Sequence, residues 1–528
     1  MTGYAYGSQQ PAVILHASEM PEQPTQFTAN LARLIAHMPP LVSEHASKHG
    51  DAGLDEGDTL TLLIKALDQI TLDCGDLRLT PVLWSNNGST FQCFLPTLSP
   101  QLAVWVFQIL VQNLENRDDP MSEETQDEFL KQIKKRARKL LPSGTNARSL
   151  IISASDRKMP FHIFDGKNVI FGYGSGSRIM NSSLTDAENV IGVRLAKNKA
   201  TTNHYLGLSG FPVTNQIVVQ KVEDIRNFTK TNGFPIVLKP TSEEQGRGVN
   251  TFITSNEEAE KKLKELSQTF GQIALERHYD GDGYRVYVLD GKVVWTGKLT
   301  AAQVIGDGVH TVRALIETVN ASEERAAVDS VVKKIPMDDV VDEILAKQSL
   351  SLASVPDEGQ KVLLSPTTNA SRGGTFVPFN DELHPENVKL CEDIGKTMNL
   401  KCSGIDLISV DASKPWHENG AVICEVNAQP QIGFNARVEL HDMLVDGLGV
   451  TPVPISIEVH AEGTEHDAPL FDRSRDRLHL RLSAQRVLNA GCPVQYFDEL
   501  TFADNVPEKT RTRLTSMLRS TPLEDRHA

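Results

Sequence analysis

Cysteine is scarce in this sequence, and the few cysteines present form neither a metal-binding nor a disulfide pattern. None of the six belongs to a CxxC pair, and none has a nearby histidine that would complete a zinc set. The spacing therefore argues against a zinc centre and against a disulfide framework. We predict buried, reduced thiols at Cys74, Cys93, Cys391, Cys402, Cys424 and Cys492.

Long apolar runs and positive charge are also missing. No stretch of about 18 uncharged apolar residues occurs, and residues 1–20 lack a basic start followed by an apolar core. The formal net charge is -15, and no Lys/Arg stripe with interleaved aromatics offsets it. We therefore expect a soluble, cytoplasmic protein that binds neither membranes nor nucleic acid.

The chain is long enough, at 528 residues, to fold into more than one domain. Helical patterns occur at 60–72, 101–114 and 122–141. From about residue 150, short apolar runs punctuated by glycine, such as SLIISAS, NVIFGYG and FPIVLKP, predict strands. Helical stretches at 257–270 and 385–398 fall between some of them, so an α/β or α+β fold is indicated.

Changes in sequence texture suggest three domains. We expect an N-terminal domain over 1–155, a central domain over 156–445 with a lid part at about 200–365, and a C-terminal extension over 446–528. The charged, helical segment 307–356 is expected to be an insertion or lid. The segment 472–491 is predicted to be part of a charged helical module.

A first chemical signal lies in PIVLKPTSEEQGRGV, where an apolar strand ends at Lys239 and a glycine-rich turn follows. A lysine at a strand end can reach a phosphate oxygen, and Arg247 could add charge. Gly246 and Gly248 would let backbone N–H groups close over phosphates. The segment is neither a P-loop nor the GxGxxG turn of a dinucleotide fold. An ordinary β-hairpin or loop remains the alternative.

A second signal is the pair of segments GIDLISV and VICEVNAQP. Because side chains alternate along a strand, Glu425 and Asn427 project from one face, and Asp406 on a neighbouring strand can join them. Three oxygen donors then converge, which suits Mg²⁺ in an ATP site. The alternative is that these acids face solvent at strand ends.

In combination, the two signals resemble the ATP-grasp superfamily. Residues 136–437 look specifically like the ATP-grasp half of cyanophycin synthetases, and SLIISASDRKMPFHIF extends a fainter similarity towards the N-terminal domain of that family. The matching segments are GYGSGSRIMNSS, NKATTNHYLGLSGFPV, KPTSEEQGRGV, ERHYDGDGYRVYVLDGKVV, VIGDGVHTV, NASRGGT, GIDLIS and ICEVNAQPQIGF. The resemblance implies two α+β subdomains clasping ATP, flanked by an N-terminal α/β domain and a small C-terminal extension.

The resemblance also implies roles for individual residues. Lys199 and Lys239 would hold the ATP phosphates, and Asp406, Glu425 and Asn427 would bind Mg²⁺, with Mn²⁺ as a possible substitute. The loop over the phosphates would comprise Gln245, Gly246, Arg247 and Gly248.

The remaining implied roles concern adenosine and the acyl substrate. Glu276 and its neighbours, including His278, would border the adenine, and Asp282 or Asp280 would contact the ribose. The residues facing the transferred phosphate and the acyl substrate would be Arg285, Lys298, Gly373 and Gly374.

Several positions depart from the pattern of the family. Gly283 stands where an acidic residue is usual, Leu299 where a second basic residue is expected, and Arg372 where a small residue precedes the paired glycines. These departures suggest a different acyl substrate. No Gly-Lys-Thr phosphate loop of a second, Mur-ligase-like ATPase follows Arg437, so we expect one ligation step per chain.

These features predict an ADP-forming ligase that joins a carboxylate to an amine through an acyl phosphate. We expect ATP and Mg²⁺ as cofactors, amino acids or peptides as substrates, and a homo-oligomeric assembly. A glutathione-synthase-like enzyme of small metabolites is a second interpretation. A third is a catalytically silent scaffold that binds nucleotide.

Overall fold

The computed structural model describes most of the chain. The described residues are 3–17, 25–38, 59–86, 91–115, 119–142, 146–243, 247–322, 325, 332–365, 372–432, 437–462 and 469–518. They form two compact units, one comprising Met1–Ser182 with Leu448–Ala528 and the other Ser183–Gly447. The three predicted domains and their limits stay a prediction.

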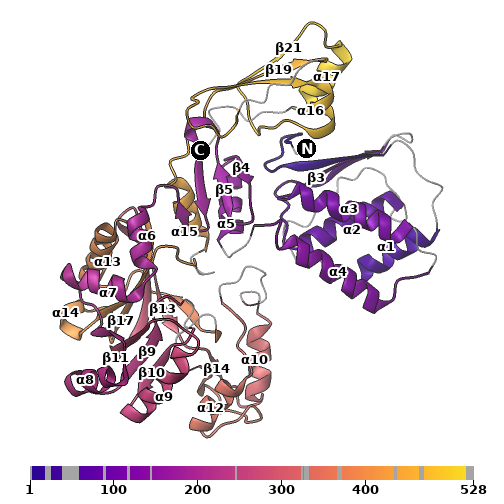
Figure 1. The fold of residues 1–528 in the computed structure, drawn as a ribbon. Helices are drawn as coiled ribbons and strands as arrows, with labels where there is room; N and C mark the ends of the chain where they lie inside the picture. Colours follow the sequence, from indigo (N-terminus) through magenta and orange to yellow (C-terminus); the bar gives the residue numbers. More distant parts are fainter. Residues whose placement is uncertain are drawn as a thin grey trace. The chain divides into compact units, whose positions relative to one another are not determined.

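The first unit contains three small sheets with flanking helices (Figure 1). Strands β1, β3 and β2 pair antiparallel, β4, β5 and β6 pair antiparallel, and β20, β19 and β21 run parallel. In chain order its elements are β1 (Ala12–Ala17), α1 (Thr25–His37), α2 (Thr59–Asp73), β2 (Leu83–Asn86), β3 (Phe91–Pro96), α3 (Pro100–Glu115), α4 (Glu123–Ala137), α5 (Ala147–Asp156), β4 (Phe161–Ile163), β5 (Asn168–Phe171), the 3-10 turn η1 (Gly174–Gly176), β6 (Arg178–Asn181), β19 (Ile455–His460), β20 (Leu478–Ser483), α16 (Ala484–Ala490), β21 (Glu499–Phe502) and α17 (Glu508–Met517).

The predicted helices α2, α3 and α4 are confirmed. The strand predicted at SLIISAS is wrong, because this segment lies in α5. Its buried residues include Ala147, Leu150, Ile151 and Ala154, which recur at helical spacing. Seven apolar and small residues are too few for periodicity alone to separate a helix from a strand.

The helical prediction for 472–491 is wrong in its central part. Residues Leu478, Leu480 and Leu482 are buried and alternate with exposed polar side chains, which is the period of a strand, and β20 forms there. The helix α16 begins only after Ser483, whose hydroxyl caps it by accepting from the N–H of Arg486.

The second unit contains two larger antiparallel sheets and the two-stranded antiparallel β14–β15 sheet. Sheet β10-β9-β11-β8 has four strands, and sheet β16-β13-β12-β17-β18 has five. In chain order its elements are β7 (Leu184–Thr185), α6 (Val190–Ala196), α7 (Lys199–Leu208), β8 (Gln216–Val219), α8 (Val222–Asn232), β9 (Ile236–Pro240), β10 (Asn250–Ile253), α9 (Asn256–Ser267), β11 (Ile273–Arg277), β12 (Asp282–Leu289), β13 (Lys292–Thr300), β14 (Gln303–Ile305), α10 (Val312–Asn320), α12 (Asp339–Lys347), β15 (Lys361–Leu363), β16 (Thr375–Pro378), α13 (Pro385–Met398), β17 (Cys402–Ser409), α14 (Trp416–Asn419), β18 (Val422–Asn427) and α15 (Arg437–Asp446).

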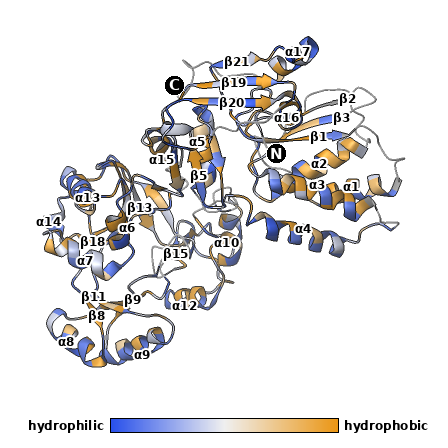
Figure 2. Cartoon of the chain, turned by 45° about the horizontal axis from the view of Figure 1, so that its top comes forward, coloured by the Kyte–Doolittle hydropathy of each residue, from blue (hydrophilic) through white to orange (hydrophobic). Residues whose placement is uncertain are grey.

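Each of these sheets has its own hydrophobic core. Helices α8 and α9 pack on the four-stranded sheet through a cluster that includes Ile225, Phe228 and Leu275. Their solvent-facing sides are hydrophilic while the strands β8, β9 and β11 are hydrophobic (Figure 2). Helix α13 packs on the five-stranded sheet, where the cluster includes Val286 and Ile405. The predicted α/β class with two α+β subdomains is therefore confirmed.

A third cluster of buried side chains supports the segment between β13 and β16. It joins the β14–β15 hairpin to α10 and α12 and includes Val304, Ile316, Leu345 and Val362. The predicted insertion thus has a small core of its own. In the part of the chain that the structure describes, we find no helix with the length and apolar character needed to cross a membrane.

Candidate functional site

Alternation along the five-stranded sheet separates its two faces. Tyr284, Val286 and Leu407 point into the core under α13. Arg285 therefore points to the other face, and its register partner on β17 is Asp406. Asp406 is paired in turn with Glu425 on β18, and Gly404 with Asn427. The sheet thus places Arg285, Asp406, Glu425 and Asn427 together on one face, as the sequence predicted for the last three.

A β-bulge in β18 modifies this face. Asp406 is opposite Glu425, whereas Leu407 is opposite Ile423, so Cys424 is the extra residue between them. A bulge turns an additional side chain out of the regular alternation. As a result, Cys424 approaches Lys239, with 3.7 Å between its Sγ and the lysine Nζ. No sequence signal marked this bulge.

Lys199 is the first cation of the site, and two contacts fix it. It lies in the first turn of α7, which Asn198 caps through a 2.9 Å hydrogen bond from the N–H of Thr201. Its Nζ lies 3.0 Å from Glu425 Oε1 and donates to the carbonyl of Glu243 at 2.7 Å. Lys199 therefore connects the carboxylate of Glu425 on β18 to the beginning of the glycine-rich loop.

Lys239 is the second cation and is almost fully buried. On β9 its Nζ lies 2.7 Å from Glu276 Oε1, and both side chains are about 5% exposed or less. Gln216 on β8 donates to the same carboxylate. The sequence identified Lys239 and Glu276 but not their pairing or Gln216, because the contact joins strands that are 37 or more residues apart.

Arg285 forms the third ion pair. Its guanidinium donates to both oxygens of Asp406, with 3.0 Å between Nη2 and Oδ2, and Asn427 Nδ2 lies 3.4 Å from the same Oδ2. Gly404 allows this arrangement, because a Cβ at that position would lie 3.2 Å from Arg285 Cδ and 2.8 Å from Pro430 Cβ. Three cations and three carboxylates therefore lie in one ionic cluster, which we call the site cluster: Lys199, Lys239, Arg285, Glu276, Asp406 and Glu425.

Burial and charge act in opposite directions on these groups. Burial alone would lower the pKa of Lys239, but its neighbours Cys424, Glu276 and Glu425 raise it above its ordinary value. Burial raises the pKa of Cys424 to about 11, so its thiol is neutral at pH 7. At that pH the negative charges that attract the Lys239 ammonium are therefore the carboxylates. Burial also raises the pKa of Glu425, against the opposing effect of Lys199. Lys239 therefore remains charged beside its carboxylates.

The glycine-rich loop begins directly after β9. Gln245 and Gly246 lie outside the described residues. Arg247 is exposed and lies 3.4 Å from Glu243 and 5.5 Å from the ring centroid of Phe270. Gly248 has a φ of +73°, which favours glycine, and packs against Phe270 and Pro240. The described part of this loop thus lies next to both lysines, through β9 and through Glu243.

The structure does not bring Asp282 and Lys298 into the site cluster. Lys298 is the register partner of Tyr284, so both lie on the face that α13 covers. Its Nζ lies 2.5 Å from Asp282, and this hydrogen bond raises the lysine pKa. Sheet alternation, which the sequence resemblance did not consider, separates these two residues from Arg285.

Three further predicted residues make no recorded contact with the side chains of the site cluster. Gly373, with a φ of +88°, packs against Ile335 and accepts a 2.8 Å hydrogen bond from Arg325, and Gly374 is buried beside it. His278 follows β11 and makes an edge contact of 5.4 Å with the ring of Phe252. None of the contacts of the described residues links these three to the site cluster.

The donor set suits a hard divalent cation. Two carboxylates and an amide on adjacent strands provide oxygen ligands. Because Glu425 is removed from solvent, its ionised form is stabilised by a neighbouring cation. No group of three or more His, Cys, Asp or Glu side chains among the described residues is arranged to hold a metal. The predicted trio differs from such a group because its third member is Asn427.

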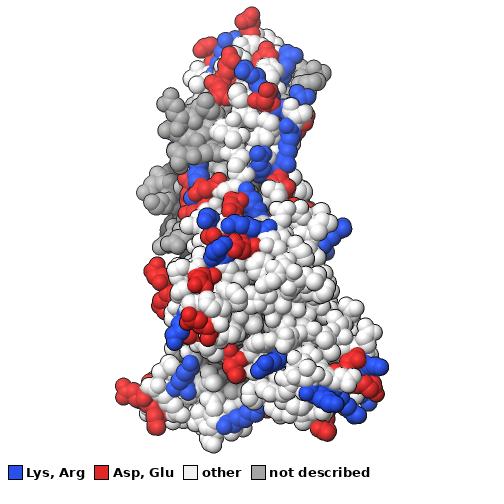
Figure 3. Space-filling model, turned by 90° about the vertical axis from the view of Figure 1, so that its left-hand side faces the viewer, with Lys and Arg blue, Asp and Glu red and all other residues white. Residues whose placement is uncertain are grey.

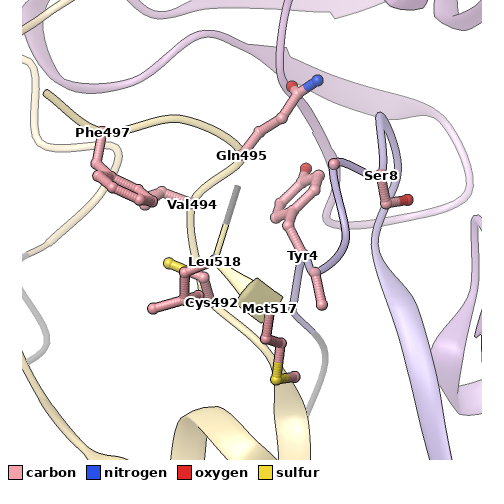
Figure 4. A pocket seen from close by; sticks show the side chains of 10 residues that line it. Tyr4, Ser8, Cys492, Val494, Gln495, Phe497, Met517 and Leu518 are labelled. Carbon is pink, nitrogen blue, oxygen red and sulfur yellow. The ribbon is translucent and has the colours of Figure 1, made fainter. Parts of the chain in front are cut away.

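A small cavity lies elsewhere, in the first unit. Tyr4, Ser8, Gln495 and Met517 are among the side chains that line it (Figure 4). Its volume of about 10 Å³ is the space of a single water. It is too small for a metabolite, and so the candidate site remains the one on the second unit.

The described charged side chains on one face of the molecule form no single-sign patch. Lys/Arg and Asp/Glu side chains are intermixed over the face drawn in Figure 3. In contrast to these surface charges, the ion pairs of the site cluster are largely buried: the side chains of Lys199 and Glu425 are 10% and 22% exposed.

Comparison with known proteins supports the resemblance seen in the motifs. The chain is 37% identical over 298 residues to a cyanophycin synthetase of Nostoc sp. (strain PCC 7120), which covers 56% of this chain and 33% of that protein. It is 26% identical over 314 residues to the glutathione biosynthesis bifunctional protein GshAB of Streptococcus agalactiae, over 58% of this chain and 41% of that protein. The predicted resemblance to cyanophycin synthetases is therefore confirmed for this part of the chain.

The chain spans about a third of the length of the cyanophycin synthetases that it matches. Among solved structures, a bifunctional glutathione synthetase from Pasteurella multocida aligns with a TM-score of 0.46 and 22% identity, over 64% of this chain and 49% of that one. No family model matches the sequence.

Proposed function

We propose that this protein is an ATP-dependent ligase that joins the carboxylate of an amino acid or peptide to an amine, releasing ADP and phosphate. The observation that supports this most directly is the site cluster, in which two lysines and an arginine lie against three carboxylates. Cations of this kind bind a triphosphate, and carboxylates with an amide bind its metal.

ATP is the substrate that would separate these ion pairs. Lys199 and Lys239 would transfer from Glu425 and Glu276 to phosphate oxygens, and the backbone N–H groups at Arg247 and Gly248 would donate to the same phosphates. Gln245 and Gly246 would contribute to this loop. Because Lys239 is held on a strand and Lys199 at a capped helix start, both ammonium groups are oriented before the phosphates arrive.

Asp406, Glu425 and Asn427 would hold Mg²⁺, or Mn²⁺ in its place. Bound there, the ion would neutralise charge on the phosphates. Once Lys199 has moved to the phosphates, the Glu425 carboxylate would be available as a ligand, and the metal would replace the lysine as the positive charge that opposes the effect of burial on its pKa. Arg285, anchored by Asp406, would then face the transferred phosphoryl group and the oxyanion that forms when the amine attacks.

A carboxylate resists attack by an amine because it is already anionic, so conversion to an acyl phosphate is the required first step. The residues described provide positioning and charge for that step, and no side-chain nucleophile is needed. Cys424 is an unsuitable nucleophile because burial raises its pKa to about 11.

The names of the relatives guide the substrate class. The similarity to a cyanophycin synthetase and to a glutathione biosynthesis protein supports amino acids or peptides as the substrates. Glu276, with His278 near it, is our candidate border of the adenine. Gly373 and Gly374 remain candidates for the acyl side of the site.

The test is phosphate release by purified protein with ATP, Mg²⁺ and pooled amino acids and dipeptides, followed by mass spectrometry of the product. We expect phosphate release that depends on the added substrate. We also expect a product whose mass is the sum of the two joined substrates less one water. Nucleotide binding without any substrate-dependent release would instead support a silent nucleotide-binding scaffold, and would contradict the proposal.

A further inference from the structure

The two ends of the glycine-rich loop are held by different residues. Its beginning is fixed by Lys199, whose N–H donates to Thr241 O at 2.9 Å and whose Nζ donates to Glu243 O at 2.7 Å. Its end, at Arg247 and Gly248, has no such link to Lys199 among the described contacts, and Phe270 lies against it.

Phe270 makes two separate contacts with this end. The guanidinium of Arg247 lies 5.5 Å from its ring centroid, a cation–π distance. The backbone of Gly248 lies so close that a Cβ there would be 2.8 Å from Phe270 Cε2 and 2.9 Å from Pro240 Cγ. The flat ring therefore forms one wall of a slot that accepts only a glycine.

The position of Phe270 itself is well determined. Its N–H donates to Leu266 O at 2.8 Å, at the end of α9, and its ring packs against the core of the four-stranded sheet. Three residues later β11 begins, and Ile273 pairs with Pro240, the last residue of β9. The ring thus lies beside the strand end from which the loop departs.

We propose that Phe270 is a positioning residue that fixes the Arg247–Gly248 limb of the loop and thereby sets the affinity for ATP. The proposal rests on the proposed function, because it assigns phosphate binding to the backbone N–H groups of that limb. Phe270 acts through Arg247 and Gly248 and does not itself touch phosphate.

The test compares Phe270→Leu with Phe228→Leu. Phe228 on α8 belongs to the same core cluster but takes no part in the contacts with Arg247 and Gly248, so its substitution reports loss of core packing alone. Phe270→Tyr keeps the aromatic face and serves as the conservative variant.

Two readouts separate positioning from stability. The first is limited digestion with trypsin in the absence of nucleotide, with the rate of cleavage after Arg247 followed by mass spectrometry. Loss of the ring contacts should speed this cleavage about 3- to 10-fold in Phe270→Leu, while Phe228→Leu and Phe270→Tyr cleave at the wild-type rate.

The second readout is phosphate release with ATP and Mg²⁺. Misplacing the loop should raise the KM for ATP on the order of 10-fold in Phe270→Leu, with kcat within about twofold and wild-type values restored in Phe270→Tyr. Equal behaviour of Phe270→Leu and Phe228→Leu in trypsin cleavage overturns the proposal. An inactive wild-type protein would contradict the proposed function, and the cleavage rates would still decide the role of Phe270.

Discussion

At the residue scale, the main feature is that each lysine proposed to bind phosphate is paired with a carboxylate. Lys199 pairs with Glu425, and Lys239 with Glu276. The sequence predicted these residue types but not their pairing, since the partners lie on separate elements and only the folded sheets bring them together. If ATP were bound without a metal, the Glu425 carboxylate would lie buried next to the phosphates with no cation between the two negative groups.

The substitution Glu425→Gln tests this pairing. Removing the negative charge frees Lys199, so metal-free ATP should bind about tenfold more tightly, a gain of about 1.4 kcal/mol. Turnover with Mg²⁺ should fall by at least on the order of 100-fold, because a metal ligand is weakened. Isothermal titration with and without EDTA measures the first effect, and phosphate release the second.

Glu386→Gln is the control for Glu425→Gln, since Glu386 is half-exposed on α13. It should change neither quantity. Unchanged or weaker binding of metal-free ATP to Glu425→Gln would show that Glu425 does not restrain Lys199.

Gly404→Ala tests the close approach of Arg285 to β17. The new Cβ would lie 2.8 Å from Pro430 Cβ and 3.2 Å from Arg285 Cδ, so the guanidinium or the turn after β18 must move. We expect kcat/KM to fall on the order of 10- to 100-fold and stability to fall by about 1–3 kcal/mol. Gly271→Ala, where no atom lies within 4 Å of the new Cβ, should be neutral in the same assays. Full activity of Gly404→Ala would mean that Arg285 has no part in the reaction.

At the element scale, helix α7 delivers Lys199 to the site. Its capping residue Asn198 satisfies the N–H of Thr201, and the N–H of Lys199 is tied to Thr241 O. Asn198→Ala should destabilise the protein by about 1 kcal/mol and raise the KM for ATP, because the first turn carries the lysine. Asn198→Asp keeps the cap and should retain both values in thermal unfolding and kinetic assays. An equal rise in the KM for ATP in both variants would argue against a role of the Asn198 cap in positioning Lys199.

The sequence predicted long, regular elements better than short ones. Helices α9 and α13 matched because their apolar spacing extends over three turns or more. The predictions for the segments that form helix α5 and strand β20 were wrong, because a run of six or seven residues fits the helical and the strand period equally well. Likewise, the bulge at Cys424 and the opposite orientation of Lys298 depend on strand register, which is set by pairing partners rather than by local sequence.

At the scale of the whole molecule, every contact of the site cluster lies within the second unit, Ser183–Gly447. Hydrogen exchange should therefore show protection by the Mg²⁺ complex of AMPPNP in α7, β9, β17 and β18. Peptides from β1, α2 and β19 should exchange at unchanged rates. Protection restricted to the first unit would place the nucleotide elsewhere and would contradict this assignment.

The central claim is that one site holds both the triphosphate and its metal, and an experimental structure with Mg²⁺ and AMPPNP tests it most directly. We predict phosphate oxygens within hydrogen-bond distance of Lys199 and Lys239 Nζ, and a metal at about 2.1 Å from oxygens of Asp406 and Glu425. A nucleotide bound away from both lysines, with Lys199 still paired to Glu425, would contradict the account.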